Sequence, residues 1–321
     1  MDAKGGMMDR RVAVKSLLAA GVAVSLAGRV GTSAGAEARA PLGVQFFTFV
    51  GRKGAEMGWD KYASNLEVVR RIGYDGVELA GLSGYAPDAI RRQAETLGLE
   101  VPSVHIGFDQ VFPFLPPQPW GPETFTQAQD AVYTPVGVVQ LARALCGPVR
   151  DVGARFAVIA GGGKLNFTTV ENVLRFADAL NKANQIARDK GLALSFHPHS
   201  PEFTPIEGGK VPFELIVANT DASIRYELDV YWSLLGSGEL PQETIRRFAP
   251  RLALFHLKDM DKNRQIATPG DGTMDFAAIR IAAQQVQSPY FFVERDGASD
   301  PVETARRSYA ALHALGYGVR S

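Results

Sequence analysis

The sequence contains a single cysteine, Cys146, in 321 residues. One thiol cannot form an internal disulfide or a thiolate metal cluster, so any metal site must use histidine and carboxylate ligands. The chain also lacks an excess of charge of either sign, because 34 Lys and Arg residues balance 34 Asp and Glu residues. This neutrality gives no electrostatic reason to expect nucleic acid or an anionic membrane surface as a partner.

The composition is that of a folded globular protein. With 46% hydrophobic and 21% charged residues, the chain has enough apolar side chains for a large core. This excludes a disordered or collagen-like protein. The length allows one large domain or two smaller ones.

The N-terminus has the layout of an export signal. The pair Arg10 and Arg11 precedes an apolar run over 16–28, and small residues follow. This order is typical of a signal peptide, and the paired arginines are typical of the twin-arginine pathway. We therefore predict a signal over residues 1–38, passage through the export machinery to the periplasm or beyond, and a folded domain over 39–321. An uncleaved anchor is the alternative, although the run is short for a membrane span.

Eight short apolar runs predict strands that are buried on both faces of a parallel sheet. The runs are 42–49, 74–79, 100–105, 155–160, 192–197, 224–229, 252–256 and 290–295. Amphipathic stretches of helical length, such as 60–72, 87–97 and 301–315, lie between them. Eight such repeats in one chain predict a closed (β/α)8 TIM barrel rather than an open sheet, with no second domain.

Four of the five histidines and three carboxylates fall at or just past the end of a predicted strand. They are His105, His197, His199, His256, Glu78, Asp229 and Glu294. Because the carboxyl ends of barrel strands meet at one mouth, these side chains should converge. Imidazole with carboxylates suits a divalent ion such as Mn, Co, Mg or Zn. The predicted metal ligands are His197, Asp229, His256 and Glu294.

Residues two apart in a strand share a face, which adds neighbours to these ligands. Lys258 should point with His256, and Glu227 should point with Asp229 from one layer deeper. A carboxylate buried at that depth would need a partner. An ion pair of Lys258 with Asp259 or Glu294 is the alternative to a role in proton transfer.

The stretch 107–135 is a long connection rich in proline and aromatic residues. It follows a predicted strand end, which places it above the mouth of the barrel, as a lid or a wall for the substrate. The alternative is that this stretch packs on the barrel without contacting the substrate, or that it forms a contact in a homo-oligomer. The residues expected to contact the substrate are His105, Trp120 and Trp232.

Five segments of the sequence resemble the xylose-isomerase-like TIM barrels, a superfamily of sugar isomerases and epimerases, inosose dehydratases and endonuclease-IV-type enzymes. The segments are 73–78 (GYDGVE), 196–203 (FHPHSPEF), 227–232 (ELDVYW), 256–259 (HLKD) and 293–296 (VERD). The resemblance extends over residues 41–316. It implies polyhydroxy carbonyl substrates and a divalent metal held on strands five to eight, at the four ligand positions named above.

One position departs from the ketose 3-epimerases of this superfamily. Those enzymes use a glutamate on strand five together with the strand-eight glutamate, whereas this chain has His197 at the strand-five position. The His-x-His pattern looks more like the branch around the inosose dehydratases and uncharacterised isomerase/epimerase-like proteins. Neutral charge and predicted export argue against DNA as the substrate.

The expected function is that of an isomerase or epimerase that removes a proton next to the carbonyl of an unphosphorylated keto sugar, with a metal stabilising the enediolate. The candidate bases are Glu294, His199 and Glu78, and the candidate acids are His199 and Lys258. The alternatives are a lyase or dehydratase acting on 3-keto sugars or inososes, and a sugar-binding barrel without turnover. The stretch 161–164 (GGGK) lacks the spacing of a phosphate-binding P-loop.

Overall fold

Eight parallel strands form one sheet in the computed structural model. The residues that the structure describes are 40–51, 57–111, 113 and 122–318. The predicted signal over 1–38 and the predicted substrate contact Trp120 lie outside them. The strands are β1 (Leu42–Gln45), β2 (Gly76–Glu78), β3 (Ser103–Ile106), β4 (Phe156–Ile159), β5 (Ala193–Phe196), β6 (Arg225–Asp229), β7 (Leu252–Leu257) and β10 (Tyr290–Val293).

The sheet curls until its two edges meet. Its order is β2-β1-β10-β7-β6-β5-β4-β3, and backbone bonds join the edge strands β2 and β3. The Val77 amide donates to the Glu100 carbonyl at 2.9 Å, and the His105 amide donates to the Leu79 carbonyl at 2.8 Å. The predicted (β/α)8 TIM barrel is confirmed.

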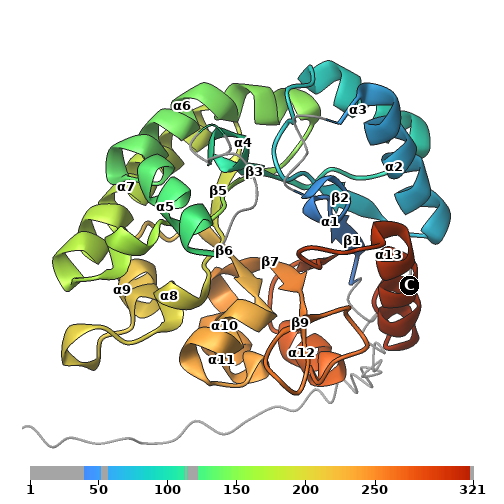
Figure 1. Cartoon of the computed structure of the whole chain (residues 1–321). Helices are drawn as coiled ribbons and strands as arrows, with labels where there is room; N and C mark the ends of the chain where they lie inside the picture. The colour runs from blue at the N-terminus through green and yellow to red at the C-terminus, as the bar shows by residue number, and fades with distance from the viewer. Residues whose placement is uncertain (1–39, 52–56, 112, 114–121, 319–321) are drawn as a thin grey trace, which may run out of the picture. The chain divides into compact units, whose positions relative to one another are not determined.

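Helices surround the strands on the outside (Figure 1). They include α2 (Trp59–Ile72), α3 (Pro87–Leu97), α6 (Pro135–Val152), α7 (Val170–Asp189), α9 (Pro212–Asn219), α11 (Pro241–Phe248), α12 (Phe276–Ala283) and α13 (Pro301–Ala314). None of the described helices combines the length and the apolar character that a membrane span needs. Gly73 and Gly98 end α2 and α3 at φ values of 119° and 64°, which glycine adopts with little strain.

Further elements follow the carboxyl ends of several strands. They are α1 (Phe47–Val50), α4 (Phe108–Val111), α5 (Pro122–Val132), α8 (Ser200–Phe203), α10 (Val230–Ser237) and the hairpin of β8 (Asp259–Met260) and β9 (Ile266–Ala267). The predicted strand 42–49 is thus shorter than expected, because the chain turns into α1. The described part of 107–135 forms two helices, α4 and α5, rather than an open loop.

The barrel interior has an apolar floor. Val158, Leu254, Tyr290 and Phe292 form a buried cluster with Ala253, separate from the larger core between strands and helices. Leu254 and Phe292 each lie two residues before a polar strand-end residue on the same face. The polar residues of the mouth therefore rest on this floor.

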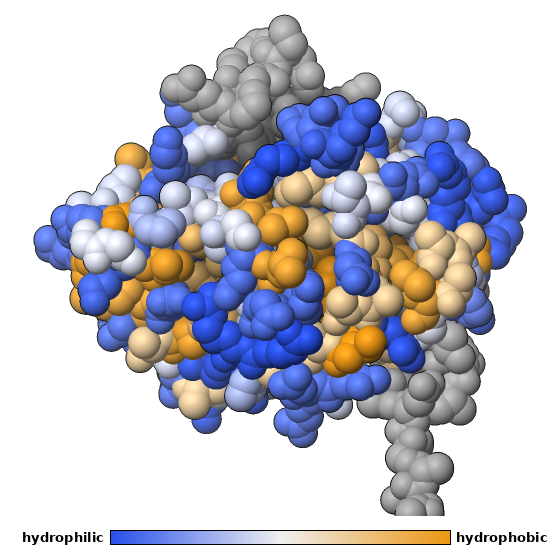
Figure 2. Space-filling model, turned by 90° about the horizontal axis from the view of Figure 1, so that it is seen from below, coloured by the Kyte–Doolittle hydropathy of each residue, from blue (hydrophilic) through white to orange (hydrophobic). Residues whose placement is uncertain are grey.

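Exposed large apolar side chains are dispersed over the surface. They are Val136, Leu165, Leu174, Leu240, Ile281, Val302 and Leu315. On the face shown in Figure 2, orange patches alternate with blue ones. A contact between copies of the chain stays a prediction.

Candidate active site

The outer group of the site consists of Asp229, His256 and Glu294, at the ends of β6, β7 and β10. One ligand atom of each lies within 4.8 Å of the others. His256 Nδ1 lies 2.6 Å from Glu294 Oε2 and 3.9 Å from Asp229 Oδ2. These three buried atoms make no hydrogen bond of good geometry with the described residues. Nitrogen and oxygen donors converging in this way can hold a divalent metal ion.

Asp229 is held in place by the helix that it begins. Its Oδ1 accepts hydrogen bonds from the backbone amides of Tyr231 at 2.9 Å and Trp232 at 3.0 Å. This N-cap fixes the carboxylate and leaves Oδ2 facing His256 and Lys258.

Lys258 brings a cation next to the outer group. Its Nζ lies 3.2 Å from Asp229 Oδ2, 3.1 Å from Glu294 Oε2 and 3.2 Å from Asp296 Oδ1. Burial alone would lower the pKa of Lys258, but the carboxylates outweigh it and raise the pKa well above the usual value. Lys258 is therefore an ammonium, and it lies 5.3 Å above the Trp232 ring.

Of the two ion-pair partners expected for Lys258, one is found beside it and the other is not. Glu294 is a partner, whereas the Asp259 carboxylate accepts backbone amides of the β8–β9 hairpin and its loop, including Gly270 at 2.9 Å and Gly272 at 2.8 Å. Asp259 is thus committed to shaping this loop.

A deeper group lies between the outer group and the apolar floor. It consists of Gln45, Glu78, His105, His197, Glu227 and the second ring nitrogen of His256. His256 Nε2 lies 2.5 Å from Glu78 Oε2 and 3.3 Å from Glu227 Oε1. His105 Nε2 lies 2.8 Å from Glu227 Oε2 and 3.1 Å from Glu78 Oε2. Imidazoles and carboxylates thus alternate around this group.

In the deeper group the imidazoles stabilise the carboxylates, whereas the two carboxylates repel each other. Burial lowers the pKa of His105, but Glu78 and Glu227 outweigh it and raise the pKa to about 9. Burial and the nearby Glu78 raise the pKa of Glu227. The expectation that Glu227 needs buried partners is met by three imidazoles, those of His105, His197 and His256. His105, expected to contact the substrate, is nearly fully buried in this group.

The four predicted metal ligands are divided between the two groups. Asp229, His256 and Glu294 form the outer group, whereas His197 turns its Nδ1 to within 3.1 Å of Glu227 Oε2. The ligand atoms of His197 converge with those of His105, Glu227 and His256, and neither Asp229 nor Glu294 belongs to this set.

His199 stands at the rim of the site, half-buried. Its ring lies 4.8 Å from the ring of His197 and 5.5 Å from that of Trp232. Burial, helped by the charge of Lys258, lowers the pKa of His199 below its usual value, so the ring is neutral. The neutral ring has a lone pair that can accept a hydrogen bond from a bound molecule, although its lowered pKa makes it a weaker base than an exposed histidine.

Sequence reasoning missed Gln45 and Asp296. Asp296 lies two residues beyond Glu294, so strand periodicity could have found it. Gln45 is a polar residue at the end of an apolar strand, and its amide donates to Glu78 Oε2 at 2.8 Å.

The glycine-rich turn after β4 is not built for phosphate. Asp130 of α5 accepts a hydrogen bond from the Leu165 amide at 2.9 Å, and a Cβ on Gly163 would lie 2.9 Å from the same carboxylate oxygen. A carboxylate therefore already uses this turn, and its charge would repel a phosphate.

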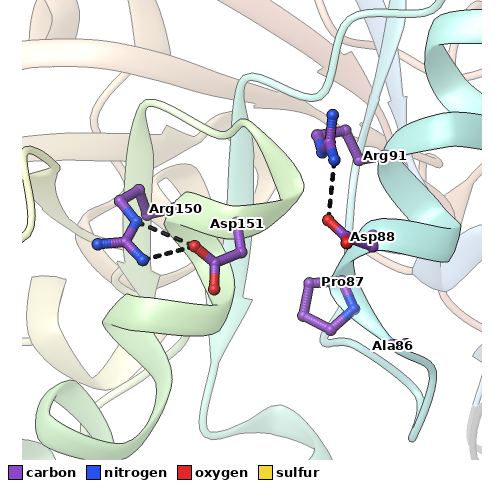
Figure 3. A pocket seen from close by; sticks show the side chains of 6 residues that line it. All are labelled: Ala86, Pro87, Asp88, Arg91, Arg150 and Asp151. Atoms are coloured by element: carbon purple, nitrogen blue, oxygen red, sulfur yellow. Dashed lines mark hydrogen bonds and ion pairs between the residues drawn. The ribbon is translucent and has the colours of Figure 1, made fainter.

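A surface hollow between α3 and α6 is also no anion site (Figure 3). Its two arginines are each paired with an aspartate of their own helix, Arg91 with Asp88 at 2.9 Å and Arg150 with Asp151 at 2.6 Å. These exposed ion pairs contribute little to the stability of the fold, and they leave neither arginine of the hollow unpaired.

The sequence matches a known protein family and several curated proteins. The family described as "Xylose isomerase-like TIM barrel" matches residues 66–315. An inosose dehydratase of Clostridium botulinum (strain Alaska E43 / Type E3) is 29% identical over 166 residues, covering 44% of this chain and 54% of that protein. The chain spans about half the length of the curated relatives that it matches.

Solved structures share the fold at lower identity. A sugar phosphate isomerase/epimerase from Parabacteroides distasonis ATCC 8503 has a TM-score of 0.65 at 21% identity, covering 90% of this chain and 98% of that chain. The IOLI protein, solved with a binding zinc atom, has a TM-score of 0.59 at 13% identity, covering 86% and 99%. At such identities the likeness concerns the architecture.

Proposed function

Because the chain belongs to the xylose isomerase-like TIM barrel family, we propose that it is an enzyme that removes the proton next to the carbonyl of a keto sugar or inosose with the help of a divalent metal ion. The observation that carries this proposal is the convergence of Asp229 Oδ2, His256 Nδ1 and Glu294 Oε2 on one position. Oxygen and nitrogen ligands of this kind fit Mn, Co, Mg or Zn.

The bound metal would supply positive charge beside the carbonyl oxygen, where negative charge develops as the proton leaves. Side chains at the rim would handle the proton. The neutral ring of His199 accepts it, and the ammonium of Lys258 donates hydrogen bonds to a substrate oxygen. Trp232, in contact with both, offers an apolar face to a sugar ring.

Elimination of water fits this arrangement better than epimerisation. An epimerase needs two groups that can each take up and return a proton on opposite faces of the substrate. Here the rim pairs a neutral base, His199, with a permanent cation, Lys258, and His197 stands where the two-glutamate enzymes have a carboxylate. This asymmetry suits an elimination in which His199 removes the proton and then returns it to the departing hydroxyl, which leaves as water.

Isomerisation or epimerisation is the second candidate, and Glu294 favours it. Its carboxylate lies 3.1 Å from Lys258 Nζ, so it offers a second group beside His199 that can take up and return a proton. We also propose that the substrate is unphosphorylated, because Asp130 stands at the glycine-rich turn and the twin-arginine layout of 1–38 indicates export to the periplasm.

Proton NMR in D2O tests the reaction. The protein is stripped of metal, restored with Mn, Co, Mg or Zn, and mixed with free ketoses, inososes and 3-keto glycosides. Metal-dependent exchange of a carbon-bound hydrogen is expected, and the product distinguishes a dehydratase from an epimerase. Saturable binding without exchange for any candidate would instead indicate a sugar-binding barrel without turnover.

The variant His199→Ala assigns the base. It should bind the metal normally and lose most of the exchange, by about 100-fold or more, because general-base catalysis contributes this much. Exchange at the wild-type rate in this variant would move the role to another residue.

A further inference from the structure

We propose that Glu78 is a positioning residue that holds His256 by its Nε2–H, so that the Nδ1 lone pair faces the metal position. The inference rests on the proposed metal site and assigns to Glu78 a role other than that of a base acting on the substrate.

The two nitrogens of His256 face different groups. Nε2 lies 2.5 Å from Glu78 Oε2, whereas Nδ1 lies on the side of Glu294 and Asp229. The orientation of the His256 ring plane is also fixed, because the ring stacks on that of His105, with the centroids 5.3 Å apart and an interplanar angle of 12°. An imidazole that donates one N–H to a carboxylate presents its other nitrogen as the ligand.

Glu78 is itself held in one orientation. Gln45 Nε2 donates to Glu78 Oε2 at 2.8 Å, and Gln45 Oε1 accepts the Phe47 amide at 3.0 Å. The second bond fixes which end of the Gln45 amide faces Glu78. A chain of hydrogen bonds therefore runs from the α1 backbone to the metal position.

The depth of Glu78 separates positioning from direct catalysis. Its side chain is fully buried, and the His256 ring lies between it and the outer group. A substrate bound at Nδ1 of His256 would be on the far side of this ring. Glu78 therefore acts through His256.

The test compares Glu78→Gln with Glu202→Gln, a matched change of another fully buried glutamate that does not contact His256. Zn²⁺ affinity is measured by competition with a chelator. In Glu78→Gln the amide can donate to Nε2 and move the ring proton to Nδ1, so we expect affinity to fall about 10–100-fold. Glu202→Gln should keep the wild-type affinity.

A second readout does not depend on the metal. In protein labelled with ¹⁵N-histidine, the His256 Nε2–H should give a downfield, slowly exchanging proton signal in wild type, and Glu78→Gln should lose it. If Glu78→Gln does not fold, Gln45→Leu serves as the second variant. It should shift the same signal and weaken zinc binding by a smaller factor.

Three outcomes would overturn the inference or its premise. Wild-type affinity in Glu78→Gln with the His256 signal unmoved would refute the positioning role. Two zinc ions per wild-type chain, with Nε2 bound to one of them, would make the deeper group a second metal site instead. If wild type binds none of Zn, Mn, Co and Mg, the proposed function fails, and the metal-free His256 signal then decides by itself whether Glu78 holds the ring.

Discussion

At the scale of single residues, His256 connects two layers of charge. One nitrogen faces the outer carboxylates and the other faces the deeper ones, at 2.6 Å from Glu294 and 2.5 Å from Glu78. Burial would lower the pKa of His256, but Glu227, Glu294 and Glu78 outweigh it and raise the pKa well above the usual value. The orientation of one ring thus depends on strands β2, β6 and β10 together.

Asp229 provides the most direct test of the metal site. Asp229→Ala should abolish metal binding while the protein stays folded, with about 1 kcal/mol lost because the α10 N-cap disappears. Metal content is measured by elemental analysis and folding by circular dichroism. Asp229→Asn keeps an acceptor for the cap and separates the two effects. Normal metal content in folded Asp229→Ala would remove this residue from the ligands.

Glu202 predicts a pH dependence of stability. Burial raises the pKa of Glu202 to about 8, above the ordinary value of 4.5. Between these two pH values the folded state holds a proton that the unfolded state has released. The contribution of Glu202 to the unfolding free energy is therefore fully present below about pH 4.5 and decreases as the pH rises to about 8.

The variant Glu202→Gln removes this titration and keeps an acceptor for the His199 amide. Relative to wild type, it should gain about 4 kcal/mol of unfolding free energy between pH 5 and pH 9, since each pKa unit is worth about 1.4 kcal/mol. Denaturant unfolding at several pH values measures the gain. A constant difference across that range would show that Glu202 does not titrate as described.

At the scale of elements, glycines set where the helices of the barrel end. Gly98 ends α3 at a φ of 64°, and a Cβ at this position would meet no atom within 4 Å. Any cost of adding a methyl group is therefore conformational rather than steric.

Gly98→Ala should lower the unfolding free energy by about 1 kcal/mol, because alanine pays to adopt a left-handed conformation. Gly147→Ala is the matched control, since Gly147 lies inside α6, is equally open and does not have a positive φ. Thermal unfolding compares the two. Equal effects at both positions would contradict the conformational explanation.

At the scale of the whole molecule, the metal should link the strands of the barrel mouth. The outer group draws on β6, β7 and β10, which are consecutive in the sheet, so a metal ion bound to it would join three strands.

Stripping the metal should therefore lower the melting temperature. A ligand at 100 times its Kd adds about 2.7 kcal/mol to the folded state, which is a shift of several degrees for a chain of this size. Scanning calorimetry with and without a chelator measures it, and Asp229→Ala should show no shift. An unchanged melting temperature in wild type would mean that metal binds weakly or not at all.

The sequence by itself determined the barrel and the strand ends that carry its polar residues. Eight apolar runs separated by amphipathic stretches leave few other ways to bury both faces of each strand, and a period of two places His256 and Lys258 on one wall. These are local properties, so they can be read along the chain. Helix ends such as Gly73 and Gly98 are local for the same reason.

Only the tertiary structure decided which strand-end residues meet. His197 and Asp229 looked equivalent in sequence, yet one faces Glu227 and the other joins His256 and Glu294. The pairing of Gln45 with Glu78, and of Asp130 with the turn after β4, joins residues 33 or more positions apart. Depth within the barrel and the direction of each ring depend on the register and tilt of all eight strands together, which no local pattern contains.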